Sequence, residues 1–242
     1  MAGWQERTRM LLGDEGLARL SSARVLVVGV GGVGGYACEM LVRSGVGRLT
    51  IVDSDEVGES NINRQLLALH STVGRPKVEV LRDRLMDINP ELDLRIVPEY
   101  INEENVAQLF LDAEGNDIHY DAVVDAIDTL SPKISLIQFC LAHGLRLVSS
   151  MGSGAKMDAT AVRIADISKT YQCPLAHMLR KRLHKLGISK GFLAVFSAEL
   201  PHKESLTLEE SRNKKSQVGT ISYMPAVFGC VCAQAAIQSI LD

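Results

Sequence analysis

The fold is decided by the stretch "RVLVVGVGGVGG", residues 24–35, in which a short apolar run leads into a cluster of glycines. The run predicts a buried strand over 24–28, and a helix is expected over 33–45. Glycines between a strand and a helix let backbone N–H groups approach an anionic phosphate; glycines that serve only tight packing are the alternative. The residues that satisfy the G-x-G-x-x-G pattern, with one glycine more, are Gly29, Gly31, Gly32 and Gly34.

Strands and helices alternate outward from this loop. Further strands are expected over 48–52, 92–97, 121–126 and 145–150. Further helices are expected over 5–20, 77–88, 103–112 and 132–143. In the first helix the side chains expected to face inward are Leu11, Leu12, Leu17 and Leu20. This alternation predicts an α/β fold with a doubly wound, mostly parallel Rossmann-like sheet and helices on both faces.

The rhythm changes after residue 154. Additional strands, perhaps antiparallel, are expected over 161–167 and 192–198, on either side of a basic helix at 174–187. Residues 199–220 are polar and predict a mobile excursion, and 224–241 predict a buried closing helix because they are apolar almost all round. We expect one domain over 1–242, with a nucleotide-binding core in 1–153 and a substrate-side extension in 154–242.

The composition is that of an ordinary soluble globular protein. The chain has 242 residues, of which 46% are hydrophobic and 23% charged. The formal net charge of −3 gives no global indication of nucleic-acid binding, so such a role depends on a local patch. Five cysteines without a CxxC pair predict reduced thiols in the cytoplasm. The first residues lack the apolar core of a signal peptide, and we expect no apolar run of membrane-spanning length.

Charged residues follow the predicted strands at the edge where ligands bind in this architecture. Asp53 closes the second strand and is expected to accept hydrogen bonds from ribose hydroxyls, which suits NAD and ATP alike. Arg64, Lys77 and Asp128 lie in the adjoining loops, where each alone would be a commonplace surface charge. Together they favour an enzyme that cleaves a triphosphate, since two cations and a metal-binding carboxylate can stabilise the leaving pyrophosphate. Asp125 is expected to be structural.

Four motifs carry a resemblance to a known superfamily. "GVGGVGGYACEML", "DSDEVGESNINRQ", "GRPKVE" and "DAIDT" resemble the ubiquitin-activating enzymes and their bacterial relatives, the ThiF and MoeB adenylyltransferases. The resemblance implies that Arg64 contacts the phosphates of ATP, Lys77 the leaving pyrophosphate and Asp128 a magnesium ion. Further nucleotide-binding positions that it implies are Asp55, Asn61 and Gln65. Members of the superfamily pair as homodimers, and the resemblance implies that Arg7, or else Arg9, completes the partner's site.

The second half of the chain indicates a branch. "DISKTYQCPLAHMLRKRLHKLGI" and "AVFSAELP" are similar to the tRNA threonylcarbamoyladenosine dehydratase (TcdA) branch. That likeness implies ATP-dependent dehydration of threonylcarbamoyladenosine in tRNA through an acyl-adenylate, with release of AMP and pyrophosphate. On the basic helix the apolar stripe is predicted to be Leu175, Met178, Leu179, Leu183 and Leu186. A tRNA-binding patch is predicted from Arg180, Lys181, Arg182 and Lys185, with a solvated charged face as the alternative.

The cysteines give no zinc site. Cys230 and Cys232 diverge around a helix and are expected to be small core residues, so no structural zinc is predicted. Cys173 is weighed as a partly exposed nucleophile and is not favoured. His177 and His184 are available by type as a proton shuttle, but the sequence identifies none.

Three other functions remain open. A ThiF- or MoeB-like enzyme would adenylate the C-terminal carboxylate of a ubiquitin-like sulfur carrier, and a sulfur-relay partner protein is compatible with this fold. A nicotinamide-dependent oxidoreductase would use the same glycine loop. A nucleotide sensor without catalysis is the third.

Overall fold

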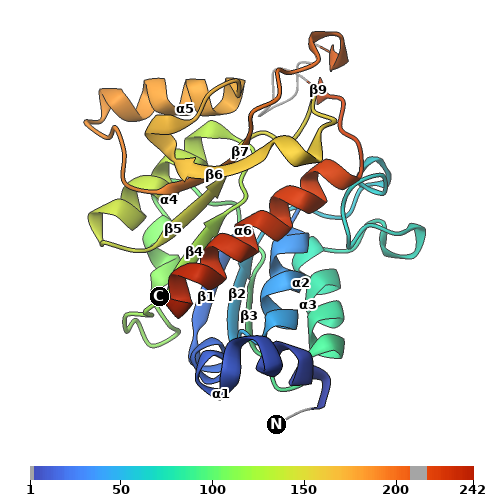
Figure 1. Cartoon of the computed structure of the whole chain (residues 1–242), viewed down its shortest axis with the longest axis vertical. Helices are drawn as coiled ribbons and strands as arrows, with labels where there is room; N and C mark the ends of the chain where they lie inside the picture. The colour runs from blue at the N-terminus through green and yellow to red at the C-terminus, as the bar shows by residue number, and fades with distance from the viewer. Residues whose placement is uncertain (1–2, 208–216) are drawn as a thin grey trace.

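A computed structural model describes residues 3–207 and 217–242 (Figure 1). Its main sheet has seven strands in the order β3-β2-β1-β4-β5-β7-β6. The strands are β1 Arg24–Val28, β2 Arg48–Val52, β3 Asp93–Val97, β4 Ala122–Asp125, β5 Leu147–Ser150, β6 Val162–Asp166 and β7 Leu193–Ser197. Every neighbouring pair is parallel except β6 with β7, which is antiparallel. The predicted doubly wound sheet is confirmed, although β7 lies parallel to β5 and only β6 is reversed.

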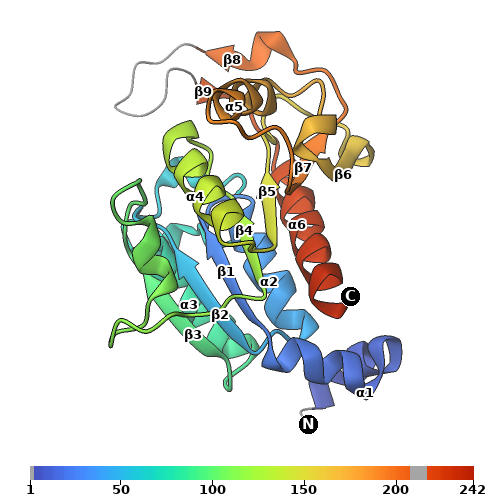
Figure 2. The ribbon, with the colours of Figure 1, turned by 90° about the vertical axis from the view of Figure 1, so that its left-hand side faces the viewer.

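Helices cover both faces of the sheet (Figures 1 and 2). The α-helices are α1 Glu6–Ser22, α2 Gly34–Ser44, α3 Lys77–Ile88, α4 Leu130–Ala142, α5 Pro174–Lys185 and α6 Tyr223–Leu241. The shorter 3-10 helices are η1 Gly3–Gln5, η2 Glu59–Asn61, η3 His70–Thr72, η4 Val106–Phe110, η5 Ala159–Ala161, η6 Ile167–Lys169 and η7 Lys203–Ser205.

The core divides into two layers because side chains alternate along each strand. In β1, Val25 and Val27 pack into the layer that contains α2, α3 and α6. Leu26 and Val28 point the other way, into the layer that contains η4, α4 and α5. The near-continuous apolar strands therefore reflect burial on both faces, as in other parallel sheets.

Two predicted helices differ from the structure. In α1 the backbone kinks at Gly13, where φ is 72°, so Leu17 and Leu20 are buried while Leu11 is 83% exposed. The prediction that Leu11 faces inward is wrong because the kink changes the face that the first half of the helix turns to the core, so that Leu12 packs against the core and Leu11 does not. The helix expected over 103–112 is only the short η4. Just before it, the Asn105 side chain accepts the Asn102 N–H and the Asn102 side chain accepts the Asn105 N–H, so side chains take the place of backbone partners there.

The closing helix α6 spans 19 residues and is long and apolar enough to cross a membrane, by length and composition alone. The expectation that no apolar run reaches that length is therefore wrong. In the fold α6 packs against α2 and crosses the sheet beside β5, with Phe228, Cys232 and Ala236 in the core (Figure 1). The apolar side chains of α6 therefore form part of the core, and the prediction of a buried closing helix is confirmed.

The polar segment 199–220 is described in part. A small antiparallel pair forms from β8 Leu206–Thr207 and β9 Gln217–Val218. The Glu199 carboxylate accepts hydrogen bonds from the backbone N–H groups of Met157 and Asp158. Of the excursion predicted over 199–220, residues 208–216 lie outside the described residues.

Candidate active site

The glycine loop joins β1 to α2 at the carboxyl edge of the sheet. Gly29 has a φ of 88°, and a Cβ added there would lie 2.9 Å from the carbonyl oxygen of Ala126. A Cβ added at Gly34 would lie only 1.7 Å from the oxygen of Gly29. Both positions therefore require glycine, for local geometry as well as for any ligand. The loop lies beside β4 at the reversal of strand order, where ligands bind in such sheets.

Asp53 ties this loop to the end of β2. One carboxylate oxygen accepts the Val30 N–H at 2.8 Å, and the other accepts the Asp55 N–H at 2.9 Å. Burial raises the pKa of Asp53, against the opposing effect of the Lys77 charge and these two N–H groups. An ionised carboxylate has about four acceptor positions, so each oxygen can still accept a ribose hydroxyl.

Lys77 begins α3 and is buried, with 5% of its surface exposed. Its Nζ lies 2.8 Å from the Asp55 carboxylate, and its backbone N–H donates to the Asp55 carbonyl. Asp55 itself is largely exposed. Lys77 is therefore not the commonplace surface charge that the sequence left open as an alternative. Its ammonium group is buried and paired with the Asp55 carboxylate.

Arg64 and its neighbours lie in the loop that follows β2. The Arg64 guanidinium donates to the Ser60 carbonyl at 2.8 Å and to the Asn63 side chain at 2.9 Å, so it is folded back on its own loop. Asn61 accepts the Gly58 N–H at 3.0 Å, which closes the turn. Gln65 is 8% exposed, and its Oε1 has no hydrogen-bond partner among the described residues. A buried amide oxygen without a partner fits a site that a ligand or water completes.

The loop around Gln65 reaches two other segments. A Cβ added at Gly31 would lie 3.6 Å from the Gln65 side-chain nitrogen, which places that amide beside the glycine loop. A Cβ added at Gly32 would lie 3.0 Å from Pro225 at the start of α6. Asn63 donates to the Thr220 carbonyl at 3.0 Å. The C-terminal half of the chain therefore helps to enclose the glycine loop.

A buried ion pair holds the loop that follows β4. The sequence indicated Asp125 as structural, whereas its partner Lys133 was not predicted. Lys133 and Asp125 are both 0% exposed, and their charged atoms lie 2.7 Å apart. Lys133 also donates to the Ile127 carbonyl at 2.9 Å, and Asp125 accepts the Ile127 N–H at 3.1 Å and the Ser149 hydroxyl at 2.6 Å. Both backbone groups of Ile127 are thus held, one residue before Asp128. The sequence did contain a signal for Lys133, because it is the one charged residue within the apolar segment of α4. A charge in that place indicates a buried partner.

Asp128 is exposed and lies just beyond β4. The described residues contain no cluster of three His, Cys, Asp or Glu side chains that could hold a metal ion. Magnesium in nucleotide sites typically uses one or two carboxylates together with substrate phosphates and water. A single carboxylate at this position fits that donor set.

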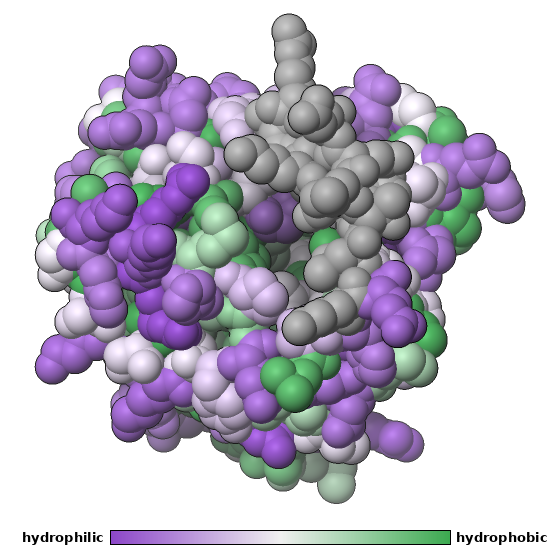
Figure 3. All heavy atoms as spheres, turned by 90° about the horizontal axis from the view of Figure 1, so that it is seen from above, coloured by the Kyte–Doolittle hydropathy of each residue, from purple (hydrophilic) through white to green (hydrophobic). Residues whose placement is uncertain are grey.

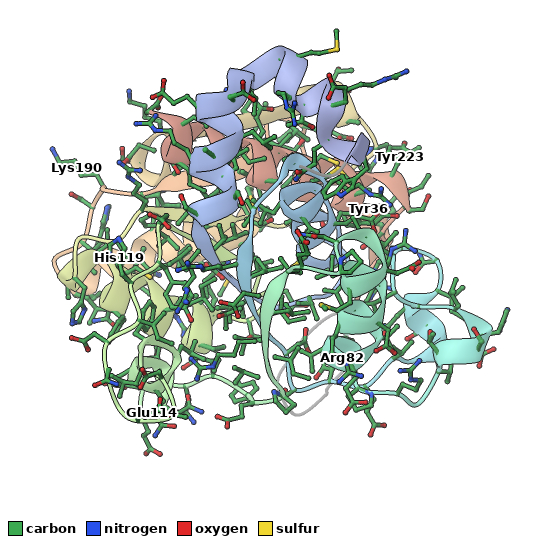
Figure 4. All side chains as sticks on the ribbon, turned by 90° about the horizontal axis from the view of Figure 1, so that it is seen from below. Tyr36, Arg82, Glu114, His119, Lys190 and Tyr223 are labelled. Carbon is green, nitrogen blue, oxygen red and sulfur yellow. The ribbon has the colours of Figure 1, made fainter. Side chains whose placement is uncertain are left out.

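Arg7 and Arg9 lie on α1, at the amino edge of the sheet, which Figure 4 shows from below. Arg7 is exposed, and Arg9 pairs with Asp14 at 3.4 Å. The glycine loop lies at the opposite edge (Figure 1). Neither arginine is placed to complete the site of its own chain.

The predicted basic patch on α5 is divided by the structure. Arg180 is half-buried and donates to the Thr170 carbonyl at 2.9 Å. The cations that are exposed are Lys181, Arg182 and Lys185, and the histidines His177 and His184 are exposed on the same helix. Met178 and Leu186, which were predicted to face inward, are 48% and 49% exposed, because the buried stripe consists of Ala176, Leu179 and Leu183.

Two cysteine predictions change. Cys173 is 4% exposed, so the premise of a partly exposed thiol is wrong. Cys232 is buried as predicted, whereas Cys230 is exposed because α6 turns that face away from the sheet.

The fold and site define a nucleotide-binding α/β protein, with a glycine loop, an acid closing β2 and a buried lysine at the crevice. The sequence profile of the ThiF family matches residues 5–242, and the chain belongs to this family.

Relatives extend over different shares of the chain. The tRNA threonylcarbamoyladenosine dehydratase of Bacillus subtilis (strain 168) is 40% identical over 243 residues, which cover 97% of this chain and 93% of that protein. The molybdopterin-synthase adenylyltransferase of Escherichia coli (strain K12) is 35% identical over 159 residues, 66% of this chain and 61% of that protein. The crystal structure of E. coli tRNA N6-threonylcarbamoyladenosine dehydratase in complex with ATP has a TM-score of 0.87 at 34% identity, covering 99% of this chain and 96% of that one.

Proposed function

We propose that this enzyme dehydrates threonylcarbamoyladenosine in tRNA at the expense of ATP, through an acyl-adenylate, with release of AMP and pyrophosphate. The observation that carries the proposal is the extent of the likeness. The Bacillus subtilis dehydratase matches 97% of the chain, including residues beyond 154, whereas the molybdopterin-synthase enzyme matches 66%. Residues 154–242 are therefore proposed to form the substrate side of a single domain.

The site suits the first chemical step. The threonyl carboxylate attacks the α-phosphorus of ATP, a P–O bond to pyrophosphate breaks, and negative charge develops on the leaving group. Lys77, and Arg64 once it turns from its own loop, are the cations that would stabilise this charge. Gly29, Gly34 and the N-terminus of α2 would cradle the phosphates, Asp53 would bind the ribose, and Asp55, Asn61 and Gln65 would line the rest of the site. Magnesium, held by Asp128 and the phosphates, would supply further charge neutralisation.

The second step closes a ring. An atom of the same modification attacks the activated carbonyl carbon, the bond from that carbon to the AMP oxygen breaks, and one proton leaves the nucleophile. The overall loss is one water from the nucleoside. No covalent enzyme intermediate is needed, so the burial of Cys173 is compatible with the mechanism.

Substrate and partner surfaces follow from the exposed residues. The exposed cations of α5, Lys181, Arg182 and Lys185, would contact RNA phosphates, with Arg180 beside them. Near the start of the chain, Trp4, Met10 and Leu11 are 42%, 80% and 83% exposed, an apolar surface suited to a second copy. In such a homodimer Arg7 would act on the partner's site, since at the amino edge it lies away from the glycine loop of its own chain. We place the enzyme in the cytoplasm because its proposed substrate is tRNA.

The second candidate is adenylation of a ubiquitin-like carrier protein. The 35% identity to the molybdopterin-synthase enzyme over the nucleotide-binding part favours it, because that part alone does not distinguish the two substrates.

The test is ATP turnover with magnesium, comparing tRNA with and without the threonylcarbamoyl group. AMP formation only with modified tRNA, and a nucleoside lighter by one water, is the expected result. Pyrophosphate exchange driven by a carrier protein and by neither tRNA would instead establish the second candidate.

A further inference from the structure

A short loop over residues 170–173 is clamped from both sides. Arg180 donates to the Thr170 carbonyl at 2.9 Å and also to the Thr170 hydroxyl. Lys156, which is 3% exposed, donates to the Gln172 carbonyl at 3.3 Å and to the Glu199 carbonyl. Two cations with backbone partners therefore hold the residues on either side of Tyr171.

Backbone strain coincides with these clamps. Among the described residues, the non-glycine positions with positive φ are Ala155 at 56° and Gln172 at 53°. Ala155 directly precedes the clamping lysine, and Gln172 is the residue that Lys156 holds. A strained conformation outside glycine is unfavourable and persists where the surroundings enforce it, often at binding sites. Tyr171 therefore lies between two residues whose backbone is held by a cation, and one of them, Gln172, has a strained φ.

The Tyr171 side chain is exposed to solvent rather than buried. It is 51% exposed, although its ring contacts buried Phe196 edge-to-face, with centroids 5.3 Å apart and planes at 73°. The contact fixes the ring, and about half of its surface remains open. An aromatic ring that is held in place and exposed loses little conformational entropy when a flat ligand stacks on it.

The loop lies at the catalytic edge of the sheet. A Cβ added at Gly152 would lie 3.8 Å from the Cys173 sulfur, so the loop touches the chain just beyond β5. Strand β5 pairs with β4, which leads to Asp128, and paired strands lie about 4.8 Å apart. Lys169, two residues before Tyr171, is exposed, and α5 with its cations begins three residues after Tyr171. Viewed from above, hydrophilic side chains are dense on the left of the molecule, the side on which Figure 1 shows α5 (Figures 1 and 3).

We propose that Tyr171 is a stacking platform for an unpaired base of the RNA substrate, next to the nucleotide that reacts. Proteins that recognise an RNA sequence usually bind single-stranded loops, whose unstacked bases stack on aromatic side chains of the protein. The cations Lys169, Lys181 and Arg182 would hold the flanking phosphates, which favours a nucleic acid over an apolar protein partner. This inference rests on the proposed function, since it identifies how the tRNA is held.

The experiment compares Tyr171→Ala, Tyr171→Phe and the control Tyr100→Ala in the full chain. Tyr100 is 48% exposed and follows β3, away from α5. Binding of an anticodon stem-loop carrying the modification and turnover of modified tRNA are measured. Tyr171→Ala should raise Kd and KM for RNA by about tenfold or more, while KM for ATP stays unchanged. Tyr171→Phe should stay within about twofold of the parent because the ring is kept, and Tyr100→Ala should match the parent.

A second measurement does not depend on activity. With Tyr171→Trp, the new indole fluorescence should be quenched when the stem-loop binds, because a base stacks on it. If RNA binds and is converted by the parent, but Tyr171→Ala leaves Kd and KM unchanged or the indole is not quenched, the platform is wrong and the proposed function stands. If the parent neither binds nor converts modified RNA, the proposed function itself fails.

Discussion

Replacing Lys133 by methionine should destabilise the protein severely, because it removes the ammonium and leaves the carboxylate of Asp125 buried. Both side chains are 0% exposed, with their charged atoms 2.7 Å apart, and among the described residues Asp125 would keep the Ser149 hydroxyl and the Ile127 N–H as donors. Breaking a buried pair on one side costs about 3–5 kcal/mol. For a chain of this size each kcal/mol lowers Tm by about 2–4 °C, so we expect Tm to fall by about 6–20 °C.

The matched variants separate charge from packing. Asp125→Asn combined with Lys133→Met removes both charges, keeps an acceptor for the Ile127 N–H and lets the amide donate to Ser149. We expect it to recover at least half of the lost Tm, since neutral replacement of a buried pair is often tolerated. Lys190→Met, at an exposed lysine, is the control and should change Tm by no more than about 2 °C.

Thermal unfolding by circular dichroism gives Tm for all four proteins, and AMP formation gives their activity. The double variant should still lose turnover about tenfold, because the Ile127 carbonyl loses its donor and the loop carrying Asp128 is no longer held. A Lys133→Met protein as stable as the parent would refute the reasoning about the buried charge. A double variant with full turnover would refute the positioning of Asp128.

Three further substitutions test the site and its support. Gly34→Ala should abolish ATP binding in a fluorescence titration and lower Tm, because its Cβ would lie 1.7 Å from the Gly29 oxygen; normal binding would contradict the loop geometry. Arg64→Ala should reduce AMP formation by about 100-fold with Tm nearly unchanged, since the hydrogen bonds of the side chain to Ser60 and Asn63 stay within its own loop. A large loss of Tm with intact turnover would instead assign Arg64 a structural role. Burial raises the pKa of Glu39, but hydrogen bonds from Arg84 and Arg43 outweigh this and hold it below its ordinary value of 4.5. A lowered pKa contributes stability above that value and loses it as pH falls, so Glu39→Gln should destabilise in urea unfolding at neutral pH and progressively less below about pH 4.5; a difference independent of pH would contradict this.

Much of the fold was predictable because it is encoded locally. The apolar strands on either side of the glycine loop, and the order of strand and helix, follow from short patterns that need no distant partner. The exceptions have local causes that patterns do not weigh. The kink at Gly13 exposes Leu11, and the side chains of Asn102 and Asn105 limit the helix expected near them.

The candidate site was predictable only as a set of positions. The edge rule for parallel sheets placed Asp53, Lys77 and Asp128 in neighbouring loops, but not the burial of Lys77 or its pairing with Asp55. Nor did any sequence pattern indicate that Arg64 folds back on the Ser60 carbonyl. Those facts depend on side-chain rotamers and on neighbours that are far apart in the chain.

The sequence by itself determined the α/β class, the glycine loop and the motifs that relate this chain to the ThiF family, because each is a property of adjacent residues. Only the tertiary structure decided the parallel alignment of β7, the pairing of Lys133 with Asp125 and the display of Tyr171 between two clamping cations. The physical reason is that a buried charge or a strained turn is stable only where distant segments supply its partners. Whether distant segments supply these partners depends on how the chain packs, and short sequence patterns do not predict that packing.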